Sequence, residues 1–261
     1  MTILKAVTVS LLILQQYLAS PFLYSDSPRK LQGLIAVDTL SNLRQTAGKD
    51  ADNMKETLEF VAIALGLKPN LYMLKDKELT AKNLKTWTDT LKRKSDDIVV
   101  FYFSGHGFRT ADSKDQWPYL YLSSDRNAVE GTWFIETIKK IQPRLALLIY
   151  DCCNNDPYNI PKFSFPSRQF LMRKAPDYSG LQRLFAQTKG LIIASASIPG
   201  KSSYGGDKGG LFTLAFINRL WNESGNKDIN WEKLMKSTKE LCSSVPTPTG
   251  PQVPQYKLTI K

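Results

Sequence analysis

The sequence predicts an α/β fold in which a mostly parallel central sheet carries helices on both faces. Two stretches of six apolar residues, Ile98–Phe103 and Leu145–Tyr150, are too short for core helices and rich in β-branched and aromatic side chains. Such stretches are typical of strands buried on both faces. Strand-like stretches also alternate with helical ones along the chain. That alternation favours parallel strands joined by helices.

The bulk composition is that of an ordinary globular protein. With 261 residues, 42% hydrophobic and 23% charged, the chain is long enough for one large core. A formal net charge of +11 is a feature of proteins that bind nucleic acid or membrane surfaces. The lysines and arginines are nevertheless spread over helices and loops, with no basic run interleaved with aromatics. A solvated basic surface and no nucleic-acid partner are therefore favoured.

The N-terminus has the pattern of a secretory signal peptide. Lys5 precedes an apolar run, Ala6–Leu14, which is too short to span a membrane, and small residues follow at positions 19 and 20. Against this, the start carries little charge and the residue before Ala19 is not small; the alternative is a buried N-terminal strand or helix. We expect a signal peptide over 1–20 and a single domain over 21–261. A true signal implies a secreted or periplasmic protein, and otherwise a cytoplasmic one.

Periodicity and turn residues place the other elements. Arg44–Asn53 is predicted to be a polar loop, and Thr80 is expected to cap a helix that ends in Lys92–Lys94. Asn154–Gln187 is long, weakly periodic and rich in Pro, Asn, Lys and Arg, so it is expected to be a functional loop or a disordered linker. The remaining predicted strands are Leu31–Thr39, Asn70–Leu74, Tyr119–Leu122, Gly190–Ser195 and Tyr256–Ile260, and the remaining helices are Met54–Leu65, Thr132–Ile141, Leu211–Trp221 and Trp231–Cys242.

A histidine and a cysteine follow the two buried strands. His106, the only histidine in the chain, lies just beyond the first strand between Gly105 and Gly107, and Cys153 lies just beyond the second. Because parallel strands end at one edge of a sheet, where ligands and chemistry collect, the imidazole and the thiol are expected to meet. Cys152 and Cys153 should point to opposite faces, one into the core and one into the site.

Such a pair predicts acyl transfer by a thiol nucleophile. A histidine lowers the pKa of a nearby thiol and carries its proton, so Cys153 would attack a carbonyl and His106 would protonate the leaving amine. The backbone N–H groups of Gly107 and Cys153 are expected to hold the oxyanion. Alone, either side chain is more often structural, but the two at matching strand ends favour a site. No metal site is predicted, because one histidine and a Cys-Cys pair lack the ligand spacing of zinc sites.

These stretches resemble the caspase and metacaspase group of cysteine peptidases. His106 and Cys153 are 47 residues apart (153 − 106), close to the roughly 50 of caspases. The resemblance implies a caspase-hemoglobinase fold, these two residues as the catalytic dyad, and a peptide or protein substrate, with no cofactor expected. It covers about Leu31–Trp221 and rests on Tyr102–Gly107, Asp151–Cys153, Lys49–Met54, Ala194–Ser197 and Gly210–Thr213.

The resemblance also implies cleavage after basic residues. In metacaspases two acids line the pocket before the scissile bond; Asp50 and Asp151 match them here, and two carboxylates suit Lys or Arg. Caspases cut after Asp with arginines, of which Arg44 matches one, whereas Ser202–Gly206 lacks the second. Asp50 has an alternative interpretation as a cap of the helix N-terminus. Metacaspases typically continue His-Ser-Gly after the cysteine, whereas Asn154–Asp156 follows here, which bears on the shape of the substrate cleft.

Regulation and competing functions remain open at this point. Calcium activates some metacaspases, but a solvated acidic patch better explains Asp96–Asp97, Asp112 and Asp115. The competing hypothesis is a catalytically weak or inactive caspase-like scaffold or interaction domain, motivated by the altered residues after the cysteine. Peptide ligation on the same dyad is a third possibility, and the oligomeric state is not predicted. If cleavage follows Lys or Arg, the self-cleavage candidates in the long loop are Arg168, Arg173 and Lys174.

Overall fold

The computed structural model describes residues 30–155 and 177–261. The predicted signal peptide over 1–20 and the self-cleavage candidates Arg168, Arg173 and Lys174 lie outside the described residues. Within the described part of the chain, no helix is both long and apolar enough to cross a membrane.

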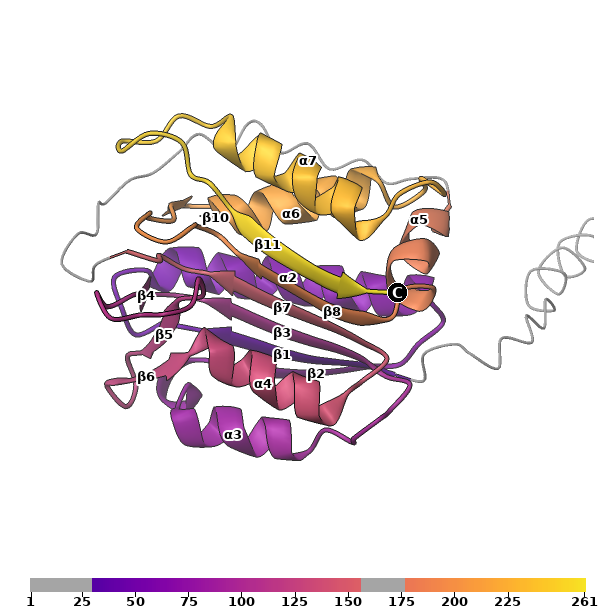
Figure 1. The fold of residues 1–261 in the computed structure, drawn as a ribbon, viewed down its shortest axis with the longest axis horizontal. Coiled ribbons are helices and arrows are strands. Elements are labelled where there is room, and N and C mark those ends of the chain that lie inside the picture. Colours follow the sequence, from indigo (N-terminus) through magenta and orange to yellow (C-terminus); the bar gives the residue numbers. More distant parts are fainter. Residues whose placement is uncertain (1–29, 156–176) are drawn as a thin grey trace, which may run out of the picture.

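A six-stranded sheet with the order β11-β8-β7-β3-β1-β2 forms the centre of the molecule (Figure 1). Five strands are parallel and β11 pairs antiparallel with β8 at one edge. This confirms the predicted mostly parallel sheet and its C-terminal edge strand. The strands are β1 (Leu31–Val37), β2 (Pro69–Leu74), β3 (Ile98–Ser104), β7 (Leu145–Asp151), β8 (Gly190–Ser195) and β11 (Gln255–Ile260).

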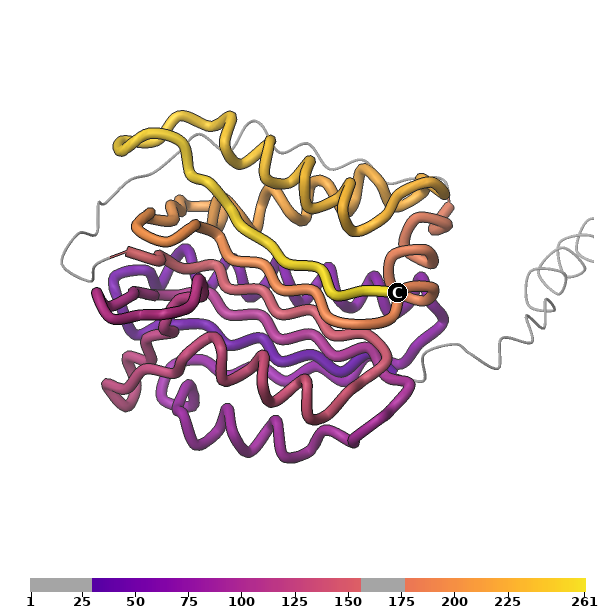
Figure 2. Tube along the Cα trace, in the orientation of Figure 1, coloured from indigo at the N-terminus to yellow at the C-terminus, as the bar shows by residue number. Residues whose placement is uncertain are grey.

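Helices cover both faces of this sheet, and each face has its own apolar core (Figures 1 and 2). The strands β3 and β7 are buried at every residue, as expected of continuous apolar runs between two helical layers. One face carries α2 (Arg44–Ala64), α6 (Leu211–Asn222) and α7 (Trp231–Ser243), and the other carries α3 (Ala81–Asp89) and α4 (Gly131–Ile141).

Two small separate sheets lie at the end of the central sheet where β3 and β7 end. A three-stranded sheet has the order β4-β5-β6, and a two-stranded hairpin pairs β9 with β10. Both lie beside the loops that carry the predicted site, as Figure 1 shows. Their bounds are β4 (Gly107–Phe108), β5 (Tyr119–Leu122), β6 (Asn127–Glu130), β9 (Gly205–Gly206) and β10 (Gly209–Gly210).

The polar loop predicted over Arg44–Asn53 is wrong, because α2 already begins at Arg44. Ala47, Ala51 and Met54 are buried and recur at helical spacing, but alanines give a weak hydrophobic signal in a polar stretch. Asp50 is therefore inside the helix, and its interpretation as an N-terminal cap is wrong.

Two other predicted boundaries also need correction. Thr80 does cap α3, since its hydroxyl accepts a hydrogen bond from the Asn83 backbone at 3.1 Å, but the helix ends at Asp89, before Lys92–Lys94. The long loop is shorter than predicted, because 179–186 form α5 (Ser179–Leu181) and one π-helical turn (Gln182–Ala186). Their apolar side chains pack into the core at helical spacing: Leu181, Leu184 and Phe185.

Candidate active site

The ends of β3 and β7 bring His106 and Cys153 to the same edge of the sheet. The two strands are neighbours in parallel register, with Ser104 opposite Asp151, and each functional residue follows its strand by two positions. A hydrogen bond of 3.3 Å from the Gly105 backbone to the Asp151 carbonyl joins the two strand ends. The strand pairing therefore places both residues at the same end of the sheet, as parallel strands require.

The Cys153 thiol is covered by the loop before β9. Its side chain is 6% exposed, its Sγ accepts a hydrogen bond from the Ser203 backbone at 3.3 Å, and the thiol donates to the Ser203 carbonyl at 3.7 Å. Burial raises the pKa of the Cys153 thiol. In this conformation the sulfur is a neutral thiol that is hydrogen-bonded to Ser203 and not to His106.

The His106 ring is oriented by Asn42, a residue that the sequence analysis missed. The Asn42 Oδ1 lies 2.7 Å from His106 Nε2. Because an amide oxygen only accepts hydrogen bonds, Nε2 carries the proton and Nδ1 keeps the lone pair that a general base needs. Burial lowers the pKa of His106, and the negative charge of Asp38 partly opposes this. Asn42 follows β1 at the same sheet edge, and that position is the signal that could have identified it.

Removing the Asn42 amide should misorient the His106 ring. We expect Asn42→Ala to lower kcat about ten- to a hundredfold, with little change in KM, because a misplaced base loses near-attack geometry. Asn42→Asp should restore much of kcat and shift the pH profile upward, since a carboxylate stabilises the imidazolium. Steady-state kinetics over pH on a peptide substrate test this, with Ser41→Ala as the neighbouring control. Equal losses in both Asn42 variants would contradict a positioning role.

Glycine at position 107 permits the close contact of the two site loops. A Cβ added there would lie 2.4 Å from the Cys152 Sγ and 2.6 Å from the Cys153 carbonyl oxygen. Cys152 itself is fully buried in the core on the α4 side, whereas Cys153 faces the Ser203 loop. This confirms that the two cysteines point to opposite sides. All three cysteines of the chain, with Cys242 in the other core, are free thiols.

Two buried carboxyl groups lie behind the cysteine. Asp50 accepts hydrogen bonds from the Ser104 hydroxyl and the Gly210 backbone, both at 2.7 Å. Asp151 accepts two on Oδ2, from the Thr213 backbone at 3.0 Å and its hydroxyl at 2.6 Å. A Cβ on Gly210 would lie 2.3 Å from Asp151 Oδ2 and 3.1 Å from Asp50 Oδ2, so both carboxyl groups pack against one glycine.

No cation among the described residues forms an ion pair with these two acids. Burial raises the pKa of Asp151 to about 6. Burial and the nearby charge of Asp151 raise the pKa of Asp50 well above its usual value. The two buried carboxyl groups lack a positive partner among the described residues, an arrangement that favours a cationic ligand.

Arg44 lies apart from this acid pair. It is exposed in the first turn of α2 and lines a cavity of about 690 Å³ together with Asn42, Lys49 and Asp76. Arg44 is therefore on the surface beside the histidine-orienting residue, whereas Asp50 and Asp151 are buried.

The unusual residues after the cysteine stabilise the rim of the site. Asn154 is fully buried; its amide donates to the Gln116 carbonyl at 2.8 Å and to the Ser197 carbonyl at 3.3 Å. Its backbone donates to the Lys201 carbonyl at 3.0 Å. The Asn155 amide donates to the Ser202 hydroxyl at 3.0 Å. These hydrogen bonds fix the position of the loop that covers Cys153.

The acids considered for calcium are scattered. Within residues 30–155 and 177–261, no three His, Cys, Asp or Glu side chains gather closely enough to hold a metal ion. Asp97 instead accepts a hydrogen bond from the Gln32 amide at 2.7 Å, and Asp115 accepts one from the Trp117 backbone at 2.7 Å.

Comparison with known proteins identifies the family. Residues 34–261 match the caspase domain. The chain belongs to the caspase-domain family. Its caspase domain is similar in structure to caspase-1 from Spodoptera frugiperda, with a TM-score of 0.56 and 14% identity over 92% of this chain and 90% of that one. It is also similar to protein GSU0716 from Geobacter sulfurreducens, with a TM-score of 0.52 and 18% identity over 88% of this chain and 92% of that one. No curated protein matches the sequence.

The family match and these likenesses confirm the predicted caspase fold. At these identities the solved structures support the fold alone. The chain therefore has the scaffold of a caspase-type cysteine peptidase, whose family acts on protein substrates.

Proposed function

We propose that this caspase domain is a cysteine endopeptidase that uses Cys153 and His106 to hydrolyse peptide bonds after Lys or Arg. The observation that carries the proposal is the parallel register of β3 and β7, which sets the imidazole and the thiol beyond matching strand ends. Asn42 supports it further, because its hydrogen bond leaves His106 Nδ1 as the basic nitrogen.

In the proposed reaction, His106 takes the thiol proton and the Cys153 sulfur forms a bond to the substrate carbonyl carbon. The backbone N–H groups of Gly107 and Cys153 would hold the resulting oxyanion, and the close packing of these two loops favours this. His106 then gives its proton to the leaving amine, the C–N bond breaks, and water hydrolyses the thioester. A substrate chain must displace the Ser203 contacts with the sulfur, so the described conformation is a closed one.

The preference for Lys or Arg rests on the unpaired acid pair. Both described hydrogen bonds to Asp151 end on Oδ2, which leaves Oδ1 for an incoming ammonium or guanidinium group. A basic side chain would supply the missing positive charge to Asp50 and Asp151 and lower their pKa values. An acidic residue in the same place would meet like charge. Arg44, which lies apart from the pair, is then free of any role in recognising the residue before the scissile bond.

Paired fluorogenic peptides that end in Arg, Lys or Asp test the proposal, with Cys153→Ala as the control. We expect release of fluorophore after Arg and Lys, none after Asp, and none from the variant. Cleavage after Asp would transfer the recognition role to Arg44. Silence on all three peptides, with and without added calcium, would favour the scaffold alternative.

The scaffold alternative has one specific observation in its favour. The Cys153 thiol is buried and its pKa is raised, and it is hydrogen-bonded to Ser203 and not to His106. We nevertheless expect Cys153 to alkylate much faster near neutral pH than Cys242, because opening of one loop exposes it whereas Cys242 is buried in the core. Peptide mapping after a timed iodoacetamide pulse measures both rates. Equal rates would support the scaffold.

Self-cleavage in the segment before Asp177 remains a prediction with its own test. If cleavage follows Lys or Arg, incubation of the purified chain should give two fragments with new ends after Arg168, Arg173 or Lys174. The Cys153→Ala chain should stay intact under the same conditions. An intact wild-type chain that still cleaves a peptide substrate would contradict self-cleavage.

A further inference from the structure

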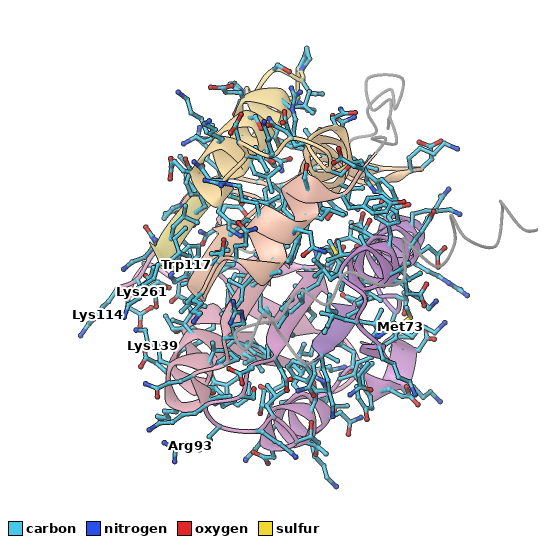
Figure 3. All side chains as sticks on the ribbon, turned by 90° about the vertical axis from the view of Figure 1, so that its right-hand side faces the viewer. Met73, Arg93, Lys114, Trp117, Lys139 and Lys261 are labelled. Atoms are coloured by element: carbon cyan, nitrogen blue, oxygen red, sulfur yellow. The ribbon has the colours of Figure 1, made fainter. Side chains whose placement is uncertain are left out.

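A second cavity lies at the end of the sheet opposite the active site. It has a volume of about 730 Å³, and its lining includes residues that precede β3, β7 and β8 at their N-terminal ends. Figure 3 looks onto this end of the molecule and labels Lys139 and Lys261, which lie near each other on one side of it. The cavity is separated from His106 and Cys153 by the length of the parallel strands.

The floor of this groove is aliphatic and is left open by the helices. On this face α4 packs against β7, and Figure 1 shows no helix in front of β8 and β11. Leu191 of β8 is directly opposite Thr259 of β11, so both side chains point to the α4 side of the sheet. With Ile138 of α4 and Pro143 they line one continuous groove. Leu258 lines it too, although its side chain packs against the core on the other face of the sheet.

The rim of the groove is cationic. Five basic residues line it and one acid does. Lys189 and Lys261 are held side by side, because their backbones exchange hydrogen bonds of 3.3 and 2.9 Å. Lys139 also forms an exposed ion pair with Glu136, which binds it only weakly. The four lysines are Lys94, Lys139, Lys189 and Lys261, and the acid is Asp96. The fifth basic residue, Arg144, is buried and donates a hydrogen bond to the Ala186 carbonyl at 2.6 Å.

We propose that this groove binds an anionic amphiphile, a molecule with a carboxylate head and an aliphatic tail. The aliphatic floor would bury the tail, and the lysines of the rim would hold the head. Nucleic acid fits poorly, because none of the described residues that line the groove is aromatic and could stack on a base. A small inorganic anion would leave the apolar floor exposed. The volume is also in the usual range of small-molecule sites.

The groove also explains part of the basic surface. The formal net charge of +11 was attributed from the sequence to solvated side chains that are spread over the chain. The fold instead gathers five of them around one apolar groove from four separate segments: 94–96, 138–144, 189–191 and 258–261. Such gathering is a property of tertiary structure and leaves no run of basic residues in the sequence.

Titration of the full chain with sodium dodecanoate below its micelle concentration tests the proposal. We expect saturable binding in isothermal titration calorimetry. Acetate, which has the head without the tail, and dodecyltrimethylammonium, which has the tail with the opposite charge, should not bind. The paired change Lys139→Glu and Lys261→Glu should weaken dodecanoate at least about tenfold through charge reversal at the rim.

Lys236→Glu with Lys239→Glu is the matched control, because it makes the same charge change on α7, on the other face of the sheet. It should leave the affinity within about twofold, the usual effect of distant surface charge in salt. Equal weakening by both pairs would indicate a response to net charge and overturn the site. Binding of acetate or of the cationic analogue as tight as that of dodecanoate would overturn the ligand class, and absence of dodecanoate binding would overturn the proposal. Circular dichroism on each variant confirms that the fold is intact.

Discussion

Replacing His106 with glutamine is expected to lower kcat/KM on a basic peptide about a thousandfold, the usual range for loss of a general acid and base. Glutamine has similar reach and keeps hydrogen-bonding groups near Asn42, but it cannot take a proton from the Cys153 thiol or return one to the leaving amine. Burial raises the pKa of that thiol, so without the imidazole very little thiolate exists at neutral pH.

Kinetics and thiol alkylation together measure this effect. The pulse with iodoacetamide should show slower reaction of Cys153 in His106→Gln, whereas Cys242 should react at its wild-type rate. The chain offers a further control, because His106 is its only histidine. Diethyl pyrocarbonate should therefore inactivate the enzyme with one modified histidine per chain. Wild-type kcat/KM in His106→Gln would remove the imidazole from the mechanism.

Most of the sheet, and the placement of His106 and Cys153 at the same end of it, were predictable from the sequence. Ile98–Phe103 and Leu145–Tyr150 are continuous apolar runs that match only buried strands, and the polar residues just beyond them mark the active edge. The resemblance to caspases added the two acids, which the fold brings together behind Cys153. These features depend on local pattern and on strand order, both of which leave a signal in the sequence.

Other features depend on contacts between distant segments and leave no such signal. Asn42 contacts His106 across 64 positions, and Ser203 covers Cys153 across 50. The start of α2 was missed because Ala47 and Ala51, small and set among polar residues, gave little periodicity. Asn154 was interpreted as a change in the shape of the substrate cleft. Its side-chain amide instead donates hydrogen bonds to two backbone carbonyls and so stabilises the rim of the active site.

Replacing Asp151 with asparagine is expected to change activity and stability in opposite directions. For substrates with Lys or Arg before the scissile bond, loss of the buried charge should lower kcat/KM about a hundredfold, because a cation left with only neutral partners loses about 2 to 5 kcal/mol. An amide oxygen can still accept the two hydrogen bonds from Thr213, so the fold is kept.

Stability should rise in the same variant at neutral pH. The pKa of Asp151 is raised in the folded state from 3.8 to about 6, so between these values the folded chain binds more protons than the unfolded chain. The contribution of Asp151 to the free energy of unfolding is therefore most favourable below about pH 4. It is lost as the pH rises through 6, which lowers the free energy of unfolding by roughly 3 kcal/mol. Asparagine has no charge to bury, and the advantage of the variant should grow over that same window.

Urea unfolding of both chains between about pH 4 and pH 8 measures this difference, with kcat/KM determined on the same preparations. Asp89→Asn is the matched control, since Asp89 is 63% exposed and pairs with Lys85 on the surface; it should change neither quantity appreciably. A less stable Asp151→Asn chain at neutral pH would show that the carboxylate already has a stabilising partner. A more stable chain with unchanged activity would show that the Asp151 charge does not bind the basic side chain of the substrate. Higher stability together with lost cleavage after Lys or Arg is the result expected if the fold keeps an unpaired buried charge for the substrate to neutralise.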